Sequence, residues 1–304
     1  MLQRIFFYIL ALLAVIALTA CVQIIRNSGS ASLAPAPAKA LRVATYNVHY
    51  IIMSQDTGPW SVGDWQRRKG PLDLAFKAVG ADVIAFQEME SFAGRSESAE
   101  NLTLDWLLAN NPAYDAAAVG DPAKIPSTQP ILYRRDRVSV VDQGWFFFST
   151  TPDVIYSRTF NGSFPAFASW AAFSEVESGE RFRVVNIHTD FRSSSNRTQS
   201  IELVAKWVRP WIEAGETVLV VGDFNVRHGS STLKILENVG LRFPKVDGAT
   251  YHFNRGLNLF GAIDHIGLSG AAEPVGEPVV LRQKFDGEWP TDHYPVVLDV
   301  TIGQ

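Results

Sequence analysis

The sequence is poor in cysteine and in clustered charge. Its 304 residues include one cysteine, Cys21, and carry a net charge of −4. A single cysteine excludes a disulfide framework and a cysteine-ligated zinc site within the chain. No long basic stripe occurs, which argues against tight nonspecific binding to extended nucleic acid. This balance still permits a small local basic site, as a catalyst acting on one phosphodiester would need.

Charged residues are absent from one long N-terminal stretch. The segment Ile5–Ile25 follows Arg4 and is apolar apart from Thr19 and Gln23. A helix that spans a bilayer needs about 20 apolar residues, so this length predicts an uncleaved membrane anchor. A secretory signal would have a shorter apolar centre and a small-residue cleavage site.

A second interpretation of the same stretch remains open. The segment Leu18–Cys21 (LTAC) resembles a bacterial lipobox, in which Cys21 would be lipidated. Both interpretations predict export and tethering to a membrane, with the rest of the chain on the extracytoplasmic side, in a periplasm or at a cell surface. A buried helix of the globular domain is the weaker alternative, because no charged residue breaks the run.

The remaining chain divides into a linker and one folded domain. Residues 27–40 (NSGSASLAPAPAKA) are rich in Ser, Ala and Pro, a composition typical of a flexible, partly extended linker. Hydrophobic residues make up 47% of the chain, which is ample for one large α/β core. We therefore predict an anchor or lipoprotein-type signal over 1–26, a linker over 27–40 and a single domain over 41–304.

Periodicity within the domain predicts alternating strands and helices without an internal repeat. Alternation and short apolar runs predict strands; helical spacing of apolar residues predicts helices. The expected strands are 41–47, 82–87, 131–133, 138–141, 145–148, 167–173, 182–188, 217–221, 262–268 and 296–300, and the expected helices are 65–79, 101–110, 197–213 and 231–239.

Polar residues gather where apolar strands end. Side chains alternate along a strand, so residues two apart share a face and point into a common pocket. Taken singly, each has a plain structural interpretation: Asn47 could cap a turn, and His188 could be a satisfied core histidine. Turns do not readily explain the joint occurrence at six strand ends of Asn47, Glu88, Asn186 with His188, Asp223 with Asn225, Asp264 with His265, and Asp292 with His293.

The same residues carry a family resemblance that covers about 41–302. In order and spacing the chain resembles the endonuclease/exonuclease/phosphatase superfamily of DNase I-like enzymes. The matching pieces are TYNV (45–48), DVIAFQE (82–88), ILYRRDRV (131–138), NIH (186–188), RTQS (197–200), GDFN (222–225), IDHI (263–266) and TDHYPV (291–296). The resemblance implies an α/β (α+β) fold, a four-layer αββα sandwich with two mixed β-sheets packed face to face and helices outside.

The resemblance also implies hydrolysis of phosphoesters with a divalent metal, Mg²⁺ or Mn²⁺. Magnesium prefers oxygen ligands and keeps several waters, so one or two carboxylates are sufficient. The implied metal ligands are Asn47, Glu88 and Asp292. The implied catalytic residues are His188, Asp223, Asn225, Asp264 and His293, and the implied substrate contacts are Asn186 and Tyr133. A strand aromatic in the core is the alternative interpretation of Tyr133.

Each implied catalytic residue has an expected role. Asp223 should orient or deprotonate the attacking water, and Asn225 should donate to a phosphate oxygen, which a carboxylate would repel. His293 should contact the scissile phosphate while Asp264 fixes its tautomer, because a buried carboxylate partner favours the imidazolium. His188 fits a second phosphate contact or general acid.

The substrate class stays open at the sequence level. Many relatives carry an arginine where this chain has Ala166, so a phosphate-side cation is missing unless Arg158 or Arg192 reaches the site. Nuclease activity is the first expectation, with phospholipid or sphingomyelin-type substrates and small phosphate esters as alternatives. A catalytically inactive binding module is a further alternative; a zinc enzyme using His188, His265 and His293 is disfavoured by their spacing. No protein partner is predicted.

Overall fold

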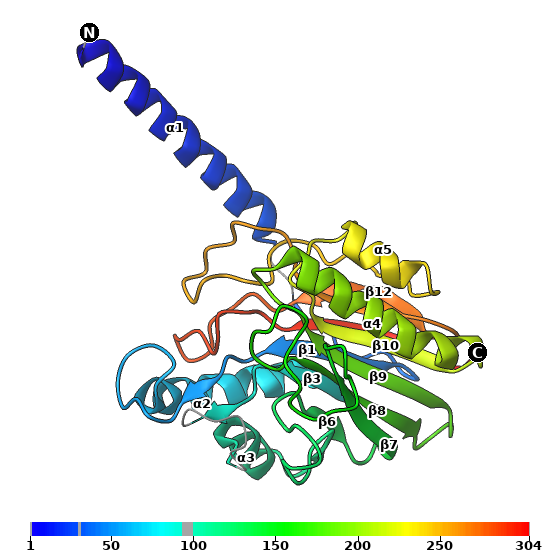
Figure 1. The fold of residues 1–304 in the computed structure, drawn as a ribbon. Coiled ribbons are helices and arrows are strands. Elements are labelled where there is room, and N and C mark those ends of the chain that lie inside the picture. The colour runs from blue at the N-terminus through cyan, green and yellow to red at the C-terminus, as the bar shows by residue number, and fades with distance from the viewer. Residues whose placement is uncertain (1, 30–31, 93–99, 304) are drawn as a thin grey trace.

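The N-terminal helix stands apart from the rest of the chain. The computed structural model describes residues 2–29, 32–92 and 100–303 (Figure 1). Helix α1 (Leu2–Asn27) projects outward from the domain. Its segment Gln3–Asn27 has a mean hydropathy of 2.8 and none of it is buried. By length and composition this helix is able to cross a membrane or to serve as a signal sequence.

The first sheet has six strands in the order β12-β13-β1-β3-β6-β5. Strand β1 pairs parallel with β3 and antiparallel with β13, so the sheet is mixed. Its strands are β1 (Leu41–Asn47), β3 (Val83–Gln87), β5 (Tyr114–Ala117), β6 (Ile131–Arg134), β12 (Glu273–Val280) and β13 (Val296–Thr301). A separate two-stranded pair joins β2 (Ile51–Ile52) and β4 (Ser91–Phe92).

The second sheet has five strands in the order β11-β10-β9-β8-β7. Here β9 and β10 are parallel neighbours and the other pairings are antiparallel. Its strands are β7 (Val138–Phe147), β8 (Phe167–Glu175), β9 (Arg181–His188), β10 (Thr217–Asp223) and β11 (Asp264–Leu268).

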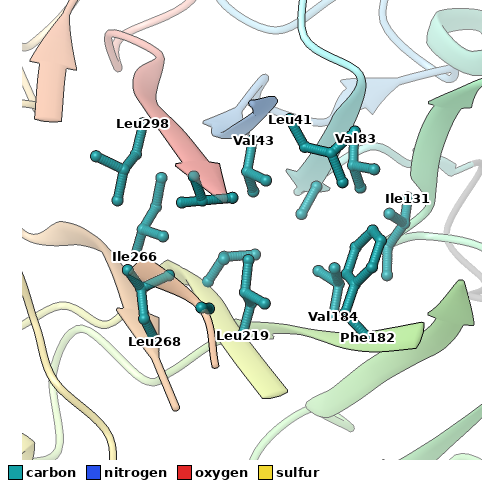
Figure 2. Close-up of a cluster of buried hydrophobic side chains, with 14 of the residues drawn as sticks. Leu41, Val43, Val83, Ile131, Phe182, Val184, Leu219, Ile266, Leu268 and Leu298 are labelled. Atoms are coloured by element: carbon teal, nitrogen blue, oxygen red, sulfur yellow. The ribbon is translucent and has the colours of Figure 1, made fainter. Parts of the chain in front are cut away.

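The two sheets pack face to face around one hydrophobic core (Figure 2). Alternate residues of each strand point inward. Leu41, Val43 and Val83 come from the first sheet, and Val184 and Leu219 come from the second; all are almost fully buried. Burial of this apolar surface is the main favourable term that holds the layers together.

Helices cover the outer face of each sheet and complete four layers. Helices α2 (Val62–Val79) and α3 (Leu102–Asn110) pack against the first sheet in one cluster of buried side chains. Helices α4 (Ser194–Glu213) and α5 (Ser231–Glu237) cover the second. The predicted αββα sandwich is confirmed.

Several predicted boundaries are wrong. The two strands expected over 138–141 and 145–148 are one strand, β7, with a register irregularity between Val140 and Asp142. Strand β12 was not expected, because its run is interrupted by Pro274 and Gly276. The described part of the predicted linker follows the domain surface, where the Arg42 guanidinium donates to Ala34 O at 2.7 Å.

Candidate active site

Strand pairing brings the polar residues to one edge of the sandwich. Asn47 is in register with Gln87 in the parallel pair β1–β3. Asp223 is in register with His188 in the parallel pair β9–β10 and with Asp264 across β11. Parallel strands end at the same edge of a sheet, so the carboxyl ends of these pairs face one another across the two layers.

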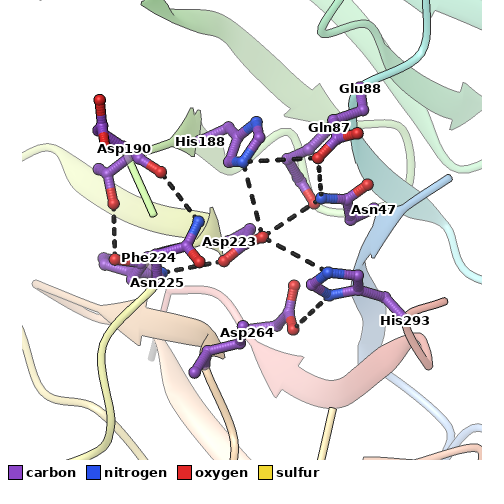
Figure 3. Close-up of polar contacts among 12 residues, drawn as sticks. Asn47, Gln87, Glu88, His188, Asp190, Asp223, Phe224, Asn225, Asp264 and His293 are labelled. Atoms are coloured by element: carbon purple, nitrogen blue, oxygen red, sulfur yellow. Dashed lines mark hydrogen bonds and ion pairs between the residues drawn. The ribbon is translucent and has the colours of Figure 1, made fainter. Parts of the chain in front are cut away.

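Within this group Asn47 joins the two sheets (Figure 3). Its Nδ2 atom donates to Glu88 Oε1 at 3.0 Å and to Asp223 Oδ2 at 3.2 Å. Asn47 comes from the first sheet and Asp223 from the second, and both are buried. One carboxamide therefore connects two carboxylates that belong to different layers.

Two histidines complete the cluster (Figure 3). His188 Nε2 is 3.7 Å from both Glu88 Oε1 and Asp223 Oδ2. His293 Nε2 is 3.7 Å from Asp223 Oδ2, and its Nδ1 is 3.0 Å from Asp264 Oδ2. Asp264 thus fixes the ring of His293 and leaves Nε2 directed at the centre of the site.

Backbone turns, rather than strand alternation, aim two of these side chains. Glu88 directly follows β3, and Asn225 lies two residues beyond the end of β10; both have positive φ angles, of 54° and 51°. The shared-face argument for Asp223 and Asn225 is therefore wrong, since Asn225 lies beyond the strand. Its backbone N–H donates to Asp223 Oδ1 at 2.9 Å, and its Nδ2 donates to Thr189 O at 2.9 Å.

The surroundings of Asp223 and His293 shift the pKa values of both side chains. Burial and the neighbouring Asp264 raise the pKa of Asp223 to about 6, against the opposing effect of His293 and His188. Burial lowers the pKa of His293, but Asp264, Asp223 and Asp292 outweigh it and raise that pKa to about 10. Near neutral pH the pair is thus a carboxylate of raised basicity beside an imidazolium.

Glu88 remains a carboxylate despite its surroundings. Burial raises its pKa, but His188, His49 and the Asn47 amide together lower it below the usual value. The nearby Glu90 differs, because burial and the charge of Glu88 raise its pKa to about 7. Glu88 therefore offers a negative, partly exposed oxygen at the mouth of the site.

Asp292 lies beside the cluster on the loop before His293. The Thr291 hydroxyl donates to Asn47 O at 3.1 Å and lies 3.3 Å from Asp292 Oδ1. Asp292 also lines a cavity of about 300 Å³ with Trp60, Tyr251, Phe253, Arg255, Leu257 and Leu259. None of these six was predicted, because they belong to loops whose sequence has no periodic signal.

Two predicted substrate contacts lie away from the cavity. Tyr133 is opposite Val83 on β6 and its ring packs 5.5 Å from that of Phe173, in the core between the sheets. Asn186 is fully buried, and its amide donates to Phe86 O at 2.7 Å while it accepts from Gln87 Nε2 at 2.7 Å. The structure therefore gives Tyr133 a packing position and makes Asn186 a cross-link between β9 and β3.

The oxygen donors fit a divalent cation. Glu88 presents a carboxylate with Asp292 nearby, and Mg²⁺ prefers such hard oxygen ligands. Asn47 directs Nδ2 at Glu88, while its Oδ1 accepts from His49 N at 3.2 Å, so Asn47 would bind a cation through Oδ1. Among the described residues, Asp223, Asp264 and His293 form an acid–imidazole group with ligand atoms within 4.8 Å of one another. In that group His293 Nδ1 already binds Asp264. The Asn47–Glu88 side is consequently the better metal candidate.

The two arginines considered as replacements at the site lie elsewhere. Arg158 is exposed and donates to Gly162 O at 2.8 Å. Arg192 is also exposed and its guanidinium carbon lies 5.0 Å from the ring centre of Phe191. Arg197 donates to Asp190 O at 2.8 Å, which fixes the loop after His188. Neither Arg158 nor Arg192 therefore supplies the missing phosphate-side cation in the described structure.

Comparisons with known proteins agree with this geometry. A model of the Endonuclease/Exonuclease/phosphatase family matches residues 44–293. A mannosyl-6-phosphatase from Bacteroides thetaiotaomicron has the same fold, with 24% identity and a TM-score of 0.70, over 86% of this chain and 99% of that chain. The human Nocturnin catalytic domain with bound sulfate anion matches at 15% identity and a TM-score of 0.61, over 88% and 96%.

A third solved structure extends the range of neighbours. D. rerio TDP2 complexed with single strand DNA product matches at 17% identity and a TM-score of 0.58, over 86% of this chain and 98% of that chain. No curated protein sequence matches the chain. At these identities the structural likeness shows a shared fold.

Proposed function

Because the chain belongs to the endonuclease/exonuclease/phosphatase family, we propose that it is a divalent-metal-dependent phosphoesterase. Members of this family are hydrolases that act on phosphoester bonds. The observation that carries the proposal is one cluster in which Asn47 donates to Glu88 and Asp223 at 3.0 and 3.2 Å, and two histidines lie 3.7 Å from these carboxylates. Turn formation or packing alone would not require that arrangement.

Asn47, Glu88 and Asp292 would hold the cation. Once bound, Mg²⁺ or Mn²⁺ would offset charge on the phosphate and the leaving oxygen. Glu88 supplies the charged ligand, since its lowered pKa keeps it ionised at neutral pH. The hydrogen bond from Asn47 fixes the orientation of that carboxylate.

Asp223 would accept the proton of the attacking water. A general base works best with a pKa near the working pH, and the value of about 6 for Asp223 meets this condition. In the hydrolysis, a bond forms between the water oxygen and phosphorus while the ester P–O bond breaks. Asp223 takes one proton from the water, and the leaving oxygen gains one from an imidazole or from solvent.

The histidines would bind the phosphate and assist the leaving group. His293 is held by Asp264 and protonated at neutral pH, so its Nε2–H can donate to a phosphate oxygen. His188 Nε2 lies between Glu88 and Asp223 and can reach the opposite side of the same phosphate. Asn225 retains a second amide hydrogen for a phosphate oxygen after its bond to Thr189.

The cavity beside Asp292 favours an ester with an apolar or aromatic group. Its aromatic and leucine side chains offer stacking and apolar contact but few hydrogen bonds. Extended nucleic acid is less well supported, because Arg158 and Arg192 do not reach the cluster and the net charge is −4. A nuclease remains the second candidate, since the similar D. rerio TDP2 structure holds a single-strand DNA product.

Tethering to a membrane belongs to the same proposal. Helix α1 has the length and hydropathy of a membrane anchor, and none of its segment Gln3–Asn27 is buried. We place the domain on the extracytoplasmic side, as the export interpretation of the N-terminus requires. The full-length chain should stay with membranes during an alkaline carbonate wash, and its release into the supernatant would contradict the anchor.

A substrate panel tests the activity. The full-length chain in detergent, with Mg²⁺ or Mn²⁺, is assayed on plasmid DNA, RNA, phospholipid micelles and sugar phosphates. We expect metal-dependent cleavage of one class, which His293→Ala abolishes and the distant, exposed Glu177→Gln leaves intact. Failure of the folded chain to cleave any member of the panel would favour the binding-module alternative.

A further inference from the structure

The base of helix α1 is attached to one segment of the domain. Ala249 N donates to Asn27 O at 3.0 Å, and Asn27 Nδ2 donates to Asn258 O at 3.2 Å. Asn258 Nδ2 in turn donates to Ser28 Oγ at 2.7 Å. Residues 249–260, called here the rim segment, therefore lie directly beside the point where α1 leaves the domain (Figure 1).

Residues 250–259 of the rim segment also border the active site, whereas Phe260 is not among the residues that line the cavity. His252 N donates to Asp292 O at 2.8 Å, and Tyr294 N donates to Thr250 O at 2.7 Å. Tyr251 and His293 pair through a backbone bridge, and their rings lie 5.1 Å apart. The backbone that holds the anchor is consequently the backbone that borders the catalytic imidazole.

The exposed surface of the rim segment is apolar and basic. Phe260 is 45% exposed and Leu257 is 38% exposed. The guanidinium of Arg227 lies 5.5 Å from the Phe260 ring centre, and Arg255 is exposed at the edge of the cavity. Aromatic and basic side chains are enriched where proteins meet the lipid head groups. A bilayer crossed by α1 would meet this surface first.

We propose that the rim segment rests on the lipid surface and that the active site hydrolyses a phosphate ester carried by the same bilayer. This inference rests on the phosphoesterase function and names its substrate class. The phosphate would lie between His188 and His293, and the apolar part of the ester would occupy the cavity of Tyr251 and Phe253.

Anchoring and docking have different effects on this reaction. Helix α1 keeps the enzyme at the membrane and so raises the effective concentration of lipid substrates. The rim segment orients the cavity toward the head groups, because it is bonded to both α1 and the 292–294 backbone. An ester dissolved in water gains from neither, which gives the inference a direct test.

Docking is measured first without any turnover. Phe260→Cys and, as control, Val176→Cys are made in a Cys21→Ser background and labelled with an environment-sensitive fluorophore. Val176 is 58% exposed and lies in the hairpin between β8 and β9, at the end of β9 opposite His188. The chain is reconstituted in vesicles of equal parts phosphatidylcholine, phosphatidylglycerol, phosphatidylinositol and sphingomyelin, with and without a quencher attached to the lipid.

The inference predicts strong quenching at position 260 and little at position 176. Equal quenching at both positions, or none at either, would overturn the docking surface. This readout does not depend on catalysis, so it stands even if the chain hydrolyses no phosphoester.

Turnover is then compared on two substrates with the same reconstituted chain and Mg²⁺. One is bis-para-nitrophenyl phosphate in solution, and the other is the phospholipid of the vesicle itself. Phe260→Asp should reduce hydrolysis of the bilayer lipid by about fivefold or more, because a carboxylate opposes contact with an anionic surface. Hydrolysis of the soluble ester should be unchanged, and Val176→Asp should alter neither rate.

The outcomes separate the two proposals. If the unmodified chain cleaves neither ester, the phosphoesterase function fails while the fluorescence result still decides docking. If it cleaves the soluble ester but no lipid, or if Phe260→Asp lowers both rates equally, the membrane-borne substrate is wrong and the phosphoesterase function stands.

Discussion

At the scale of single residues, Asp264 tests a positioning role, because it acts through His293. Its Oδ2 binds His293 Nδ1, and its Oδ1 is buried without a hydrogen-bond partner in the described structure. Asp264→Asn keeps the shape but removes the charge that favours the imidazolium. We expect kcat to fall by about a hundredfold or more with a smaller change in KM.

The measurement is a kinetic comparison on a soluble phosphoester, with thermal unfolding recorded for the same samples. Asp136→Asn is the control, because Asp136 is exposed and pairs only with Arg134 in the contacts described. A folded Asp264→Asn enzyme with unchanged kcat would contradict the role given to the Asp264–His293 pair.

Residue type alone predicted most members of the cluster. Acids, amides and imidazoles at the ends of apolar strands are unusual, and Asn47, Glu88 and His188 do lie within 4 Å of a partner in the site. Tyr133 could not be placed, since one residue of register decides which face of a strand it occupies. The sequence did not indicate Trp60 and Tyr251, because loop residues follow neither the two-residue period of strands nor the helical period.

At the scale of elements, Gly222 controls the approach of β10 to β9. It has φ 143°, and an added Cβ would lie 1.9 Å from Ile187 O. Gly222→Ala must push β9 and β10 apart next to Asp223, which is the residue in register with His188. We expect a loss of about 2–4 kcal/mol in the free energy of unfolding and a large fall in activity.

Urea unfolding and a turnover assay measure both effects. Gly70→Ala is the matched control, because Gly70 lies in helix α2 and an added Cβ there would meet no atom within 4 Å. That control should be neutral or slightly stabilising. Equal stability of Gly222→Ala and the unmodified chain would show that the strands do not need this close approach.

His265 makes stability depend on pH. It is fully buried on β11, where burial lowers its pKa to about 4 despite the Val226 carbonyl and Asp264, and His228 adds to the lowering. His265 therefore takes up a proton near pH 6.5 in the unfolded chain, but only near pH 4 in the folded chain. The contribution of neutral His265 to the free energy of unfolding is complete above about pH 6.5. Up to roughly 3 kcal/mol of it is lost as the pH falls toward about 4.

Urea midpoints at about pH 7 and about pH 5 test this sign. His265→Gln can keep the 2.8 Å contact with Val226 O and cannot titrate, so its midpoint at the lower pH, relative to the higher pH, should lie above that of the unmodified chain. His252 is a second buried histidine whose pKa is lowered, to about 3, so some dependence should remain. Asp223, Glu90 and His293 have raised pKa values and favour the folded state at the lower pH, so the comparison of the two chains is the test. Equal changes of midpoint in His265→Gln and the unmodified chain would contradict the assignment.

Element types were easier to predict than element ends. The strands β1, β3 and β9 and the helix α4 follow clear two-residue or helical periods, and their positions agree with the structure. Strand β12 was missed because Pro274 and Gly276 interrupt it at the edge of its sheet, where such residues are tolerated.

At the scale of the whole molecule, the site exists only when both sheets are packed. Asn47 and Glu88 come from the first sheet, while His188 and Asp223 come from the second. Neither sheet alone carries the proposed metal ligands together with the proposed base. The family resemblance, now confirmed, identified this arrangement from motifs that lie up to about 250 residues apart.

The direct test of the whole account is the rate of phosphoester hydrolysis as a function of Mg²⁺, for the full-length chain and for Glu88→Gln. The account predicts no turnover in EDTA, a saturable rise with Mg²⁺, and a loss of about a thousandfold in Glu88→Gln, because the cation loses its charged ligand. Turnover that persists in EDTA, or a Glu88→Gln variant that keeps the metal response of the unmodified chain, would contradict it.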